Sequence, residues 1–142
     1  MARWMARLVR TSPGAVDAGL LLLRGFFGLA LALGHGHGKL LDLGKFIGSV
    51  AQRGIPLPGV LGPAAAFSEF LGGVLLAIGL LTRPAAVFVL CTMLVAGLHV
   101  HASDPFQRKE LALAYAIVAM VVLLAGPGRF SLDALLARRS GR

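Results

Sequence analysis

Cysteine is nearly absent from this sequence, which contains Cys91 alone. One cysteine cannot form a disulfide within the chain, and without a CxxC pair the protein has no thiol–disulfide couple of its own. The sequence also lacks the CxxCH motif that attaches haem covalently, a glycine-rich phosphate loop and a Rossmann fingerprint. We therefore expect neither haem nor a dinucleotide cofactor, and we interpret Cys91 as a small buried hydrophobe.

Charged residues are scarce as well. They make up 14% of the 142 residues, whereas 57% are hydrophobic. A soluble domain carries about 25% charged residues, so this composition indicates a membrane protein. The length suits one domain, residues 1–142, with no room for a separate soluble domain.

The net charge of +8 raises the question of a nucleic-acid partner. The basic residues lie in the tails and short loops, and no patch of basic and aromatic residues would follow a phosphate backbone. We exclude nucleic acid and interpret these residues as topology signals that contact the anionic lipids of the bilayer.

Four long apolar stretches occupy most of the chain, at about 16–33, 62–81, 84–100 and 110–124. Each approaches the roughly 20 residues that a helix needs to cross a bilayer. Helices satisfy all backbone polar groups without water. The predicted fold is therefore all-α, an integral membrane four-helix bundle, with residues 84–100 antiparallel to the preceding span because the turn between them is short.

Several short signals refine this prediction. Ser12 and Pro13 can begin the first helix, and Ser131 can cap a short amphipathic helix over 132–138. A short interfacial helix is expected over 41–50. Arg24 interrupts the first span, and we expect it to reach the interface or to pair with Asp17.

The basic residues also predict the orientation. Four spans place both termini on one side, and that side would hold Arg3, Arg7, Arg10, Arg83, Arg129, Arg138, Arg139 and Arg142. The opposite side would hold Lys39, Lys45, Arg53, Arg108 and Lys109. The positive-inside rule then puts both termini in the cytoplasm of a multi-pass protein of the bacterial inner membrane. The basic N-terminal segment is interpreted as a retained anchor.

Ionisable residues that enter the apolar stretches gather near one membrane face. Such residues are costly at membrane depth, so a cluster of them predicts a functional site. Each of the four predicted helices contributes at least one residue to this cluster, at the outward-facing end of the bundle. The cluster comprises His35, His37, Lys39, Glu69, His99, His101 and Glu110.

These residue types suit two kinds of ligand. Imidazole and carboxylate groups bind copper, iron or zinc, so His35, His37, Glu69, His99, His101 and Glu110 are the predicted metal ligands. Alternatively, the site holds a quinone head group or a sulfur anion, with Lys39 and Tyr115 as binding residues and a glutamate as proton relay. Helical residues two apart point about 200° apart, so we expect at least one histidine of each pair to face the core.

Short motifs occur in a fixed order along nearly the whole chain. They are His35-Gly36-x-x-Lys39-Leu40, Glu69 with Leu71-Gly72-Gly73, Gly79-Leu80-Leu81-Thr82-Arg83, Met93-Leu94-Val95-Ala96 ending at His101, Glu110-Leu111-Ala112, and Gly126-Pro127-Gly128-Arg129-Phe130-Ser131-Leu132-Asp133. In these motifs the chain resembles the DoxX family of small four-helix membrane proteins.

The resemblance implies a role in membrane redox chemistry, since relatives include subunits of a thiosulfate:quinone oxidoreductase. It carries over His35, Lys39, Glu69, His101 and Glu110 as polar positions of the family, whereas His37 and His99 are additional. Two functions remain open at this point. The protein is a membrane oxidoreductase or oxidoreductase subunit with an outward-facing site, or it is a non-catalytic scaffold that assembles a partner oxidoreductase. The oligomeric state is also open, with a homodimer as one option.

Overall fold

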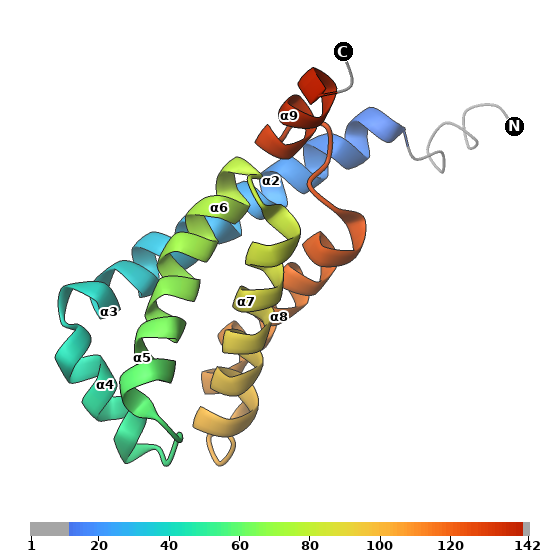
Figure 1. Ribbon diagram of the computed structural model, residues 1–142. Helices are drawn as coiled ribbons and strands as arrows, with labels where there is room; N and C mark the ends of the chain where they lie inside the picture. Colours follow the sequence, from blue (N-terminus) through green and yellow to red (C-terminus); the bar gives the residue numbers. More distant parts are fainter. Residues whose placement is uncertain (1–11, 141–142) are drawn as a thin grey trace, which may run out of the picture.

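The structure is a computed structural model that describes residues 12–140, so the predicted basic residues of the N-terminal segment and Arg142 lie outside the described part. Every regular element in residues 12–140 is a helix (Figure 1). The α-helices are α2 (Pro13–Leu31), α3 (His37–Leu41), α4 (Leu43–Gln52), α5 (Pro58–Phe67), α6 (Gly73–Ile78), α7 (Thr82–Val95), α8 (Phe106–Ala125) and α9 (Leu132–Ser140). Three π-helical turns join or extend them: η1 (Ala32–Gly36), η2 (Ser68–Gly72) and η3 (Ala96–Val100).

The long helices confirm the membrane character of the chain. Three of them are long and apolar enough to cross a bilayer, namely Pro13–Leu41, Pro58–Ile78 and Thr82–Val100. The predicted second span begins earlier than expected, at Pro58, because a proline in the first turn of a helix is well tolerated. It ends at Ile78, because Gly79 adopts a φ of 71° that terminates the helix.

The predicted caps are present. The Ser12 side chain accepts a hydrogen bond from the Ala15 N–H at 3.1 Å, and Pro13 occupies the first turn of α2. The Ser131 hydroxyl accepts from the Ala134 N–H at 3.1 Å and begins α9. Both oxygens satisfy N–H groups that have no partner within the helix.

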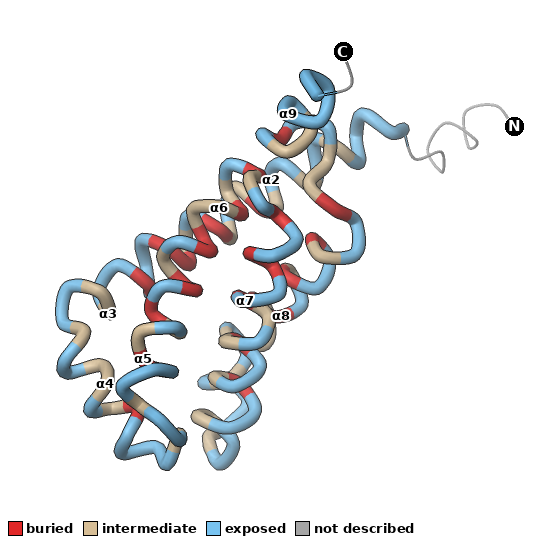
Figure 2. The backbone as a smooth tube through the Cα atoms, viewed as in Figure 1, coloured by how far each residue is buried: buried red, intermediate tan, exposed pale blue. Residues whose placement is uncertain are grey.

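Small residues bring the helices into close contact. Gly28 of α2 lies against Gly73 and Ala77 of α6, where an added Cβ would be 2.5 Å from the Gly73 carbonyl oxygen. The small residues Gly73 and Ala77 therefore allow α2 and α6 to approach each other closely. Figure 2 marks the buried residues along the backbone. Most members of the hydrophobic core lie on α7 and α8, which pack on each other, and Leu31 of α2 and Leu76 of α6 also belong to it.

Arg24 occupies a different position from the one expected. It neither reaches the interface nor pairs with Asp17, but is buried with 1% of its surface exposed. Its guanidinium donates to the carbonyl oxygens of Leu76 and Ala77, at 3.1 and 2.6 Å, and to that of Phe130. Arg24 therefore caps the C-terminal end of α6 and ties it to the segment before α9, because the last carbonyls of a helix need an outside donor.

Candidate functional site

Each of the three membrane helices has its π-helical turn at the level of the predicted polar cluster. His35 lies in η1, Glu69 in η2, and His101 follows directly after η3. η1 packs against η2, and η2 against α7. A π turn inserts one extra residue into a helix, which rotates the following side chains, and such turns are frequent at functional sites.

Lys39 and Glu69 form the centre of the site. The Lys39 Nζ donates to both carboxylate oxygens of Glu69, at 2.5 and 2.6 Å. The Glu69 side chain is 2% exposed and that of Lys39 is 30% exposed. The Lys39 Nζ also lies 4.8 Å from the centre of the Phe46 ring. A buried carboxylate is tolerated only when it is paired and hydrogen-bonded, which Lys39 achieves here.

The ion pair lies where two cavities meet. The large cavity has a volume of about 520 Å³ and is bounded mainly by α4, α5 and α7. The small cavity has a volume of about 220 Å³ and is bounded by η1, α7, η3 and α8. Four residues line both cavities, namely Lys39, Glu69, Ala96 and His101.

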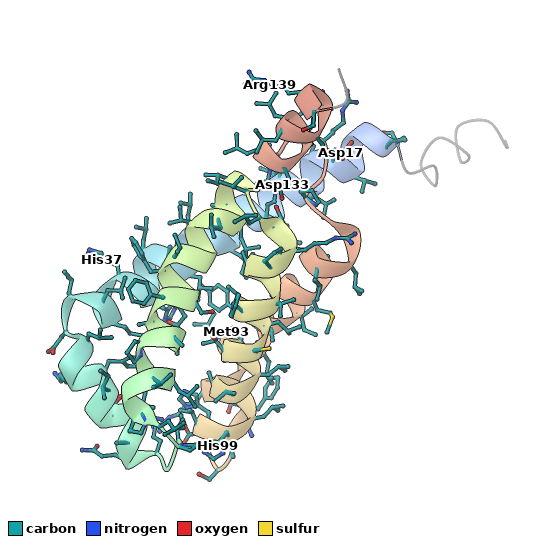
Figure 3. All side chains as sticks on the ribbon, viewed as in Figure 1. Asp17, His37, Met93, His99, Asp133 and Arg139 are labelled. Atoms are coloured by element: carbon teal, nitrogen blue, oxygen red, sulfur yellow. The ribbon has the colours of Figure 1, made fainter. Side chains whose placement is uncertain are left out.

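One histidine of each predicted pair faces these cavities, as the helical geometry requires. His35 lines the small cavity, where its ring meets that of Tyr115 edge to face, with centroids 5.7 Å apart. His101 lines both cavities. His37 and His99 line neither cavity. Both are exposed (Figure 3), as is His35. The ring of His37 instead meets that of Phe70, at 6.2 Å.

His101 is held by a residue that sequence reasoning missed. Its Nδ1 lies 2.7 Å from Oδ2 of Asp104, and this hydrogen bond lowers the pKa of Asp104. An ionised carboxylate only accepts hydrogen bonds, so Nδ1 of His101 donates this one, which leaves Nε2 as an acceptor whenever the ring is neutral. In the sequence, this hydrogen bond is indicated by the position of Asp104, three residues after His101.

α8 presents a different face to the site from the one expected. Arg108, Leu111, Ala112 and Tyr115 line the small cavity, whereas Glu110 is exposed and lines neither cavity. Helical residues at i, i+3, i+4 and i+7 share one face, and position 110 falls outside that set. Tyr115 thus lines the small cavity, and its role as a binding residue stays a prediction.

The structure does not gather the predicted metal ligands into one group. Within residues 12–140, no three His, Cys, Asp or Glu side chains lie close enough together to hold a metal ion. His35, Glu69 and His101 share the wall of the small cavity, and metal binding there stays a prediction.

Cys91 differs from its interpretation as a buried residue. It is exposed, and it lies on the wall of the large cavity. The same wall holds Thr92, whose hydroxyl donates to the Ser68 hydroxyl at 3.0 Å and links α7 to η2.

Comparison with known families identifies the family of the chain. The sequence profile described as DoxX matches residues 19–102, more than half of the chain. The chain belongs to the DoxX family. Comparisons with curated proteins and with solved structures give no match.

The DoxX match covers the residues of the central site. Lys39, Glu69 and His101 all fall inside residues 19–102, as does His35. Tyr115 and the rest of α8, by contrast, lie beyond the matched part. The DoxX assignment and the three apolar helices together make this a multi-pass membrane protein.

Proposed function

We propose that this DoxX protein binds the head group of a quinone at the Lys39–Glu69 pair, as a membrane redox protein or as the quinone-binding subunit of a partner oxidoreductase. The observation that carries the proposal is a buried ion pair at the end of a large, mainly apolar cavity. Ligand-binding sites are typically mainly apolar cavities of about 300–1,000 Å³ with a few polar groups that orient the ligand.

The polar groups suit the two oxygens of a quinone ring. The ammonium of Lys39 donates to an oxygen of the quinone ring, and Nε2 of His101 accepts from a hydroxyl of the reduced ring. Glu69 exchanges the protons that a quinone takes up on reduction and releases on oxidation. The electrons come from, or go to, the partner oxidoreductase.

Binding of decylubiquinone to the protein in nanodiscs, measured by calorimetry, tests the proposal. Glu69→Gln and His101→Gln should each weaken binding about tenfold or more, equivalent to roughly 1.4 kcal/mol. Glu110→Gln and His99→Gln are matched controls, because these residues line neither cavity, and they should change the affinity less than twofold. Equal effects in both pairs would refute the proposal.

The metal version of the site makes a different prediction. Purified protein would contain metal in stoichiometric amount, and a His35→Ala/His101→Ala variant would lose it. Quinone binding that persists after treatment with a chelator supports the quinone site, whereas binding that disappears with the metal supports the metal site.

A scaffold function is the second candidate, and the ion pair itself supplies the argument for it. Lys39 in α3 and Glu69 in η2 connect two membrane helices, so the pair can hold the bundle together without any ligand. A scaffold would bind no quinone, and a Glu69→Gln variant would lose stability without losing a redox activity.

We also infer that α8 is the fourth span. Its 20 residues reach about 30 Å, the thickness of the hydrocarbon core. Arg108, Lys109 and Glu110 would then lie at the outer interface, and both termini would lie in the cytoplasm of the bacterial cell. Labelling of cysteines introduced near each terminus, from either side of the membrane, tests this topology.

A further inference from the structure

The large cavity opens through the side of the bundle. Its wall between α5 and α7 includes five residues that are exposed at the protein surface: Leu61, Ala64, Phe88, Cys91 and Val95. We call these residues the mouth. Phe88 is 66% exposed and Val95 is 47% exposed, so the mouth is a surface feature and not a closed interior wall.

The arrangement of the helices explains the opening. α7 packs on η2 and α6, whereas α5 packs on α4 and α3. α5 and α7 consequently diverge below η2, as Figure 1 shows. The hydrogen bond from Thr92 to Ser68 joins α7 to η2 where this divergence begins.

The mouth lies between two helices that are able to cross the membrane. α5 belongs to the apolar helix Pro58–Ile78 and α7 to the apolar helix Thr82–Val100, both able to cross the membrane. An opening between two neighbouring membrane-spanning helices faces the hydrocarbon core. The exposed side chains of the mouth are apolar or, in Cys91, weakly polar, which suits contact with alkyl chains.

The cavity is polar at one end and apolar at the other. Lys39, Glu69 and His101 form the polar end, and Phe88, Val95 and Leu61 belong to the mouth. We propose that the ligand enters sideways from the bilayer between α5 and α7, and that it carries an alkyl or prenyl tail that stays in the mouth. This inference rests on the proposed quinone site and adds the route of entry and the class of molecule.

Cys91 provides a direct test, because it is the only cysteine of the chain and lies in the mouth. The rate of its alkylation is measured on the whole protein in nanodiscs, with lipid-soluble N-ethylmaleimide and with a charged, sulfonated maleimide. The lipid-soluble reagent should react at least tenfold faster. A faster reaction with the charged reagent would overturn the proposal, because the mouth would then face water.

Three probes separate the tail from the ring. Decylubiquinone should slow the alkylation of Cys91 at least fivefold, whereas the same quinone ring without the decyl chain should leave the rate unchanged at equal concentration. A redox-inert dimethoxybenzene with a decyl chain is the third probe.

Equal protection by the inert probe would support the tail site and refute the quinone assignment. Calorimetric binding of decylubiquinone without protection of Cys91 would refute the tail site alone, and protection by the tailless ring would do the same. If no tailed probe protects Cys91, the tail site is likewise refuted.

A bulky side chain in the mouth gives an independent test. Ala64→Trp should slow the association of decylubiquinone at least tenfold. Val60→Trp is the matched control on the same helix, because Val60 is exposed but lies outside the cavity wall, and it should leave the association rate within twofold. Equal rates in the two variants would overturn the proposed route.

Discussion

Gly36 makes the closest backbone contact in the site, and replacing it should separate two π turns. A Cβ on Gly36 would lie 2.3 Å from the Phe70 nitrogen and 2.7 Å from the Glu69 carbonyl carbon, whereas ordinary contacts begin at 3.4 Å. η1 and η2 would have to move apart by about 1 Å, since backbone atoms cannot rotate away as a side chain does.

The expected cost follows from overpacking, which destabilises by about 1–3 kcal/mol. Alanine has a better helix propensity than glycine, which offsets about 0.5–1 kcal/mol. Because both neighbours of the added Cβ are backbone, the upper part of the overpacking range applies. Gly36→Ala should thus lower the free energy of unfolding by about 2 kcal/mol, roughly thirtyfold in the unfolding constant.

Gly34→Ala is the matched control in the same π turn. No atom lies within 4 Å of its added Cβ, so this variant should be as stable as the wild type or more stable by up to about 1 kcal/mol. Unfolding in mixed micelles, by titration with SDS, measures both variants. Gly36→Ala should also weaken decylubiquinone binding, because it displaces Lys39 from Glu69. Equal stability of the two variants would refute the contact between η1 and η2.

Three further outcomes are expected. Arg24→Met removes the donor of three backbone carbonyls and should lower the free energy of unfolding by about 3 kcal/mol in the same titration. Arg83→Met, at an exposed position, should lower it by at most about 0.5 kcal/mol. Equal losses of stability would contradict the capping role of Arg24. Burial opposes ionisation of Asp133, but hydrogen bonds from two backbone N–H groups at the start of α7 lower its pKa overall. The ionised carboxylate of Asp133 therefore stabilises the folded protein above the unfolded pKa of about 3.9, and this stabilisation is lost as the pH falls through the lower folded pKa. Asp133→Asn should be less stable at neutral pH, and its stability should fall less steeply in acid than that of the wild type. An unchanged acid limb of the stability curve would contradict this. Thr92→Val removes the hydrogen bond to Ser68 and should cost about 0.6 kcal/mol, with quinone affinity within twofold in calorimetry; a tenfold loss would show that this hydroxyl contacts the ligand.

Sequence patterns predicted the features that depend on local chemistry. The caps at Ser12 and Ser131 were expected, because a hydroxyl before a helix satisfies its first N–H groups. The contribution of one histidine from each pair was expected too, since a helix cannot turn both His35 and His37 to one side. Long apolar stretches predicted four membrane helices; three of these are long and apolar enough to cross a bilayer, although their ends shifted by several residues.

Features that depend on distant segments were not predicted. A π turn adds one residue to a helix and leaves no clear trace in hydrophobic periodicity, so the rotation that places Glu69 at the junction of two cavities could not be foreseen. The face of α8 that lines the small cavity was not foreseen, because Glu110 was chosen for its charge and Arg108 was treated as a topology signal only. A role for Glu110 as a ligand stays a prediction. The partners of Arg24 lie in α6 and near Phe130, far along the chain, and no local pattern connects them.

The capping role of Arg24 has a consequence for the order in which the protein assembles. Its acceptors lie 52, 53 and 106 residues further along the chain. During synthesis α2 thus enters the membrane well before the carbonyls that Arg24 binds have been made, and the last of them, that of Phe130, is made only after α8. The α2–α6 pair reaches its final state only after the segment before α9 has left the ribosome, so a chain truncated before Phe130 would insert its helices and still lack the bond that locks the bundle.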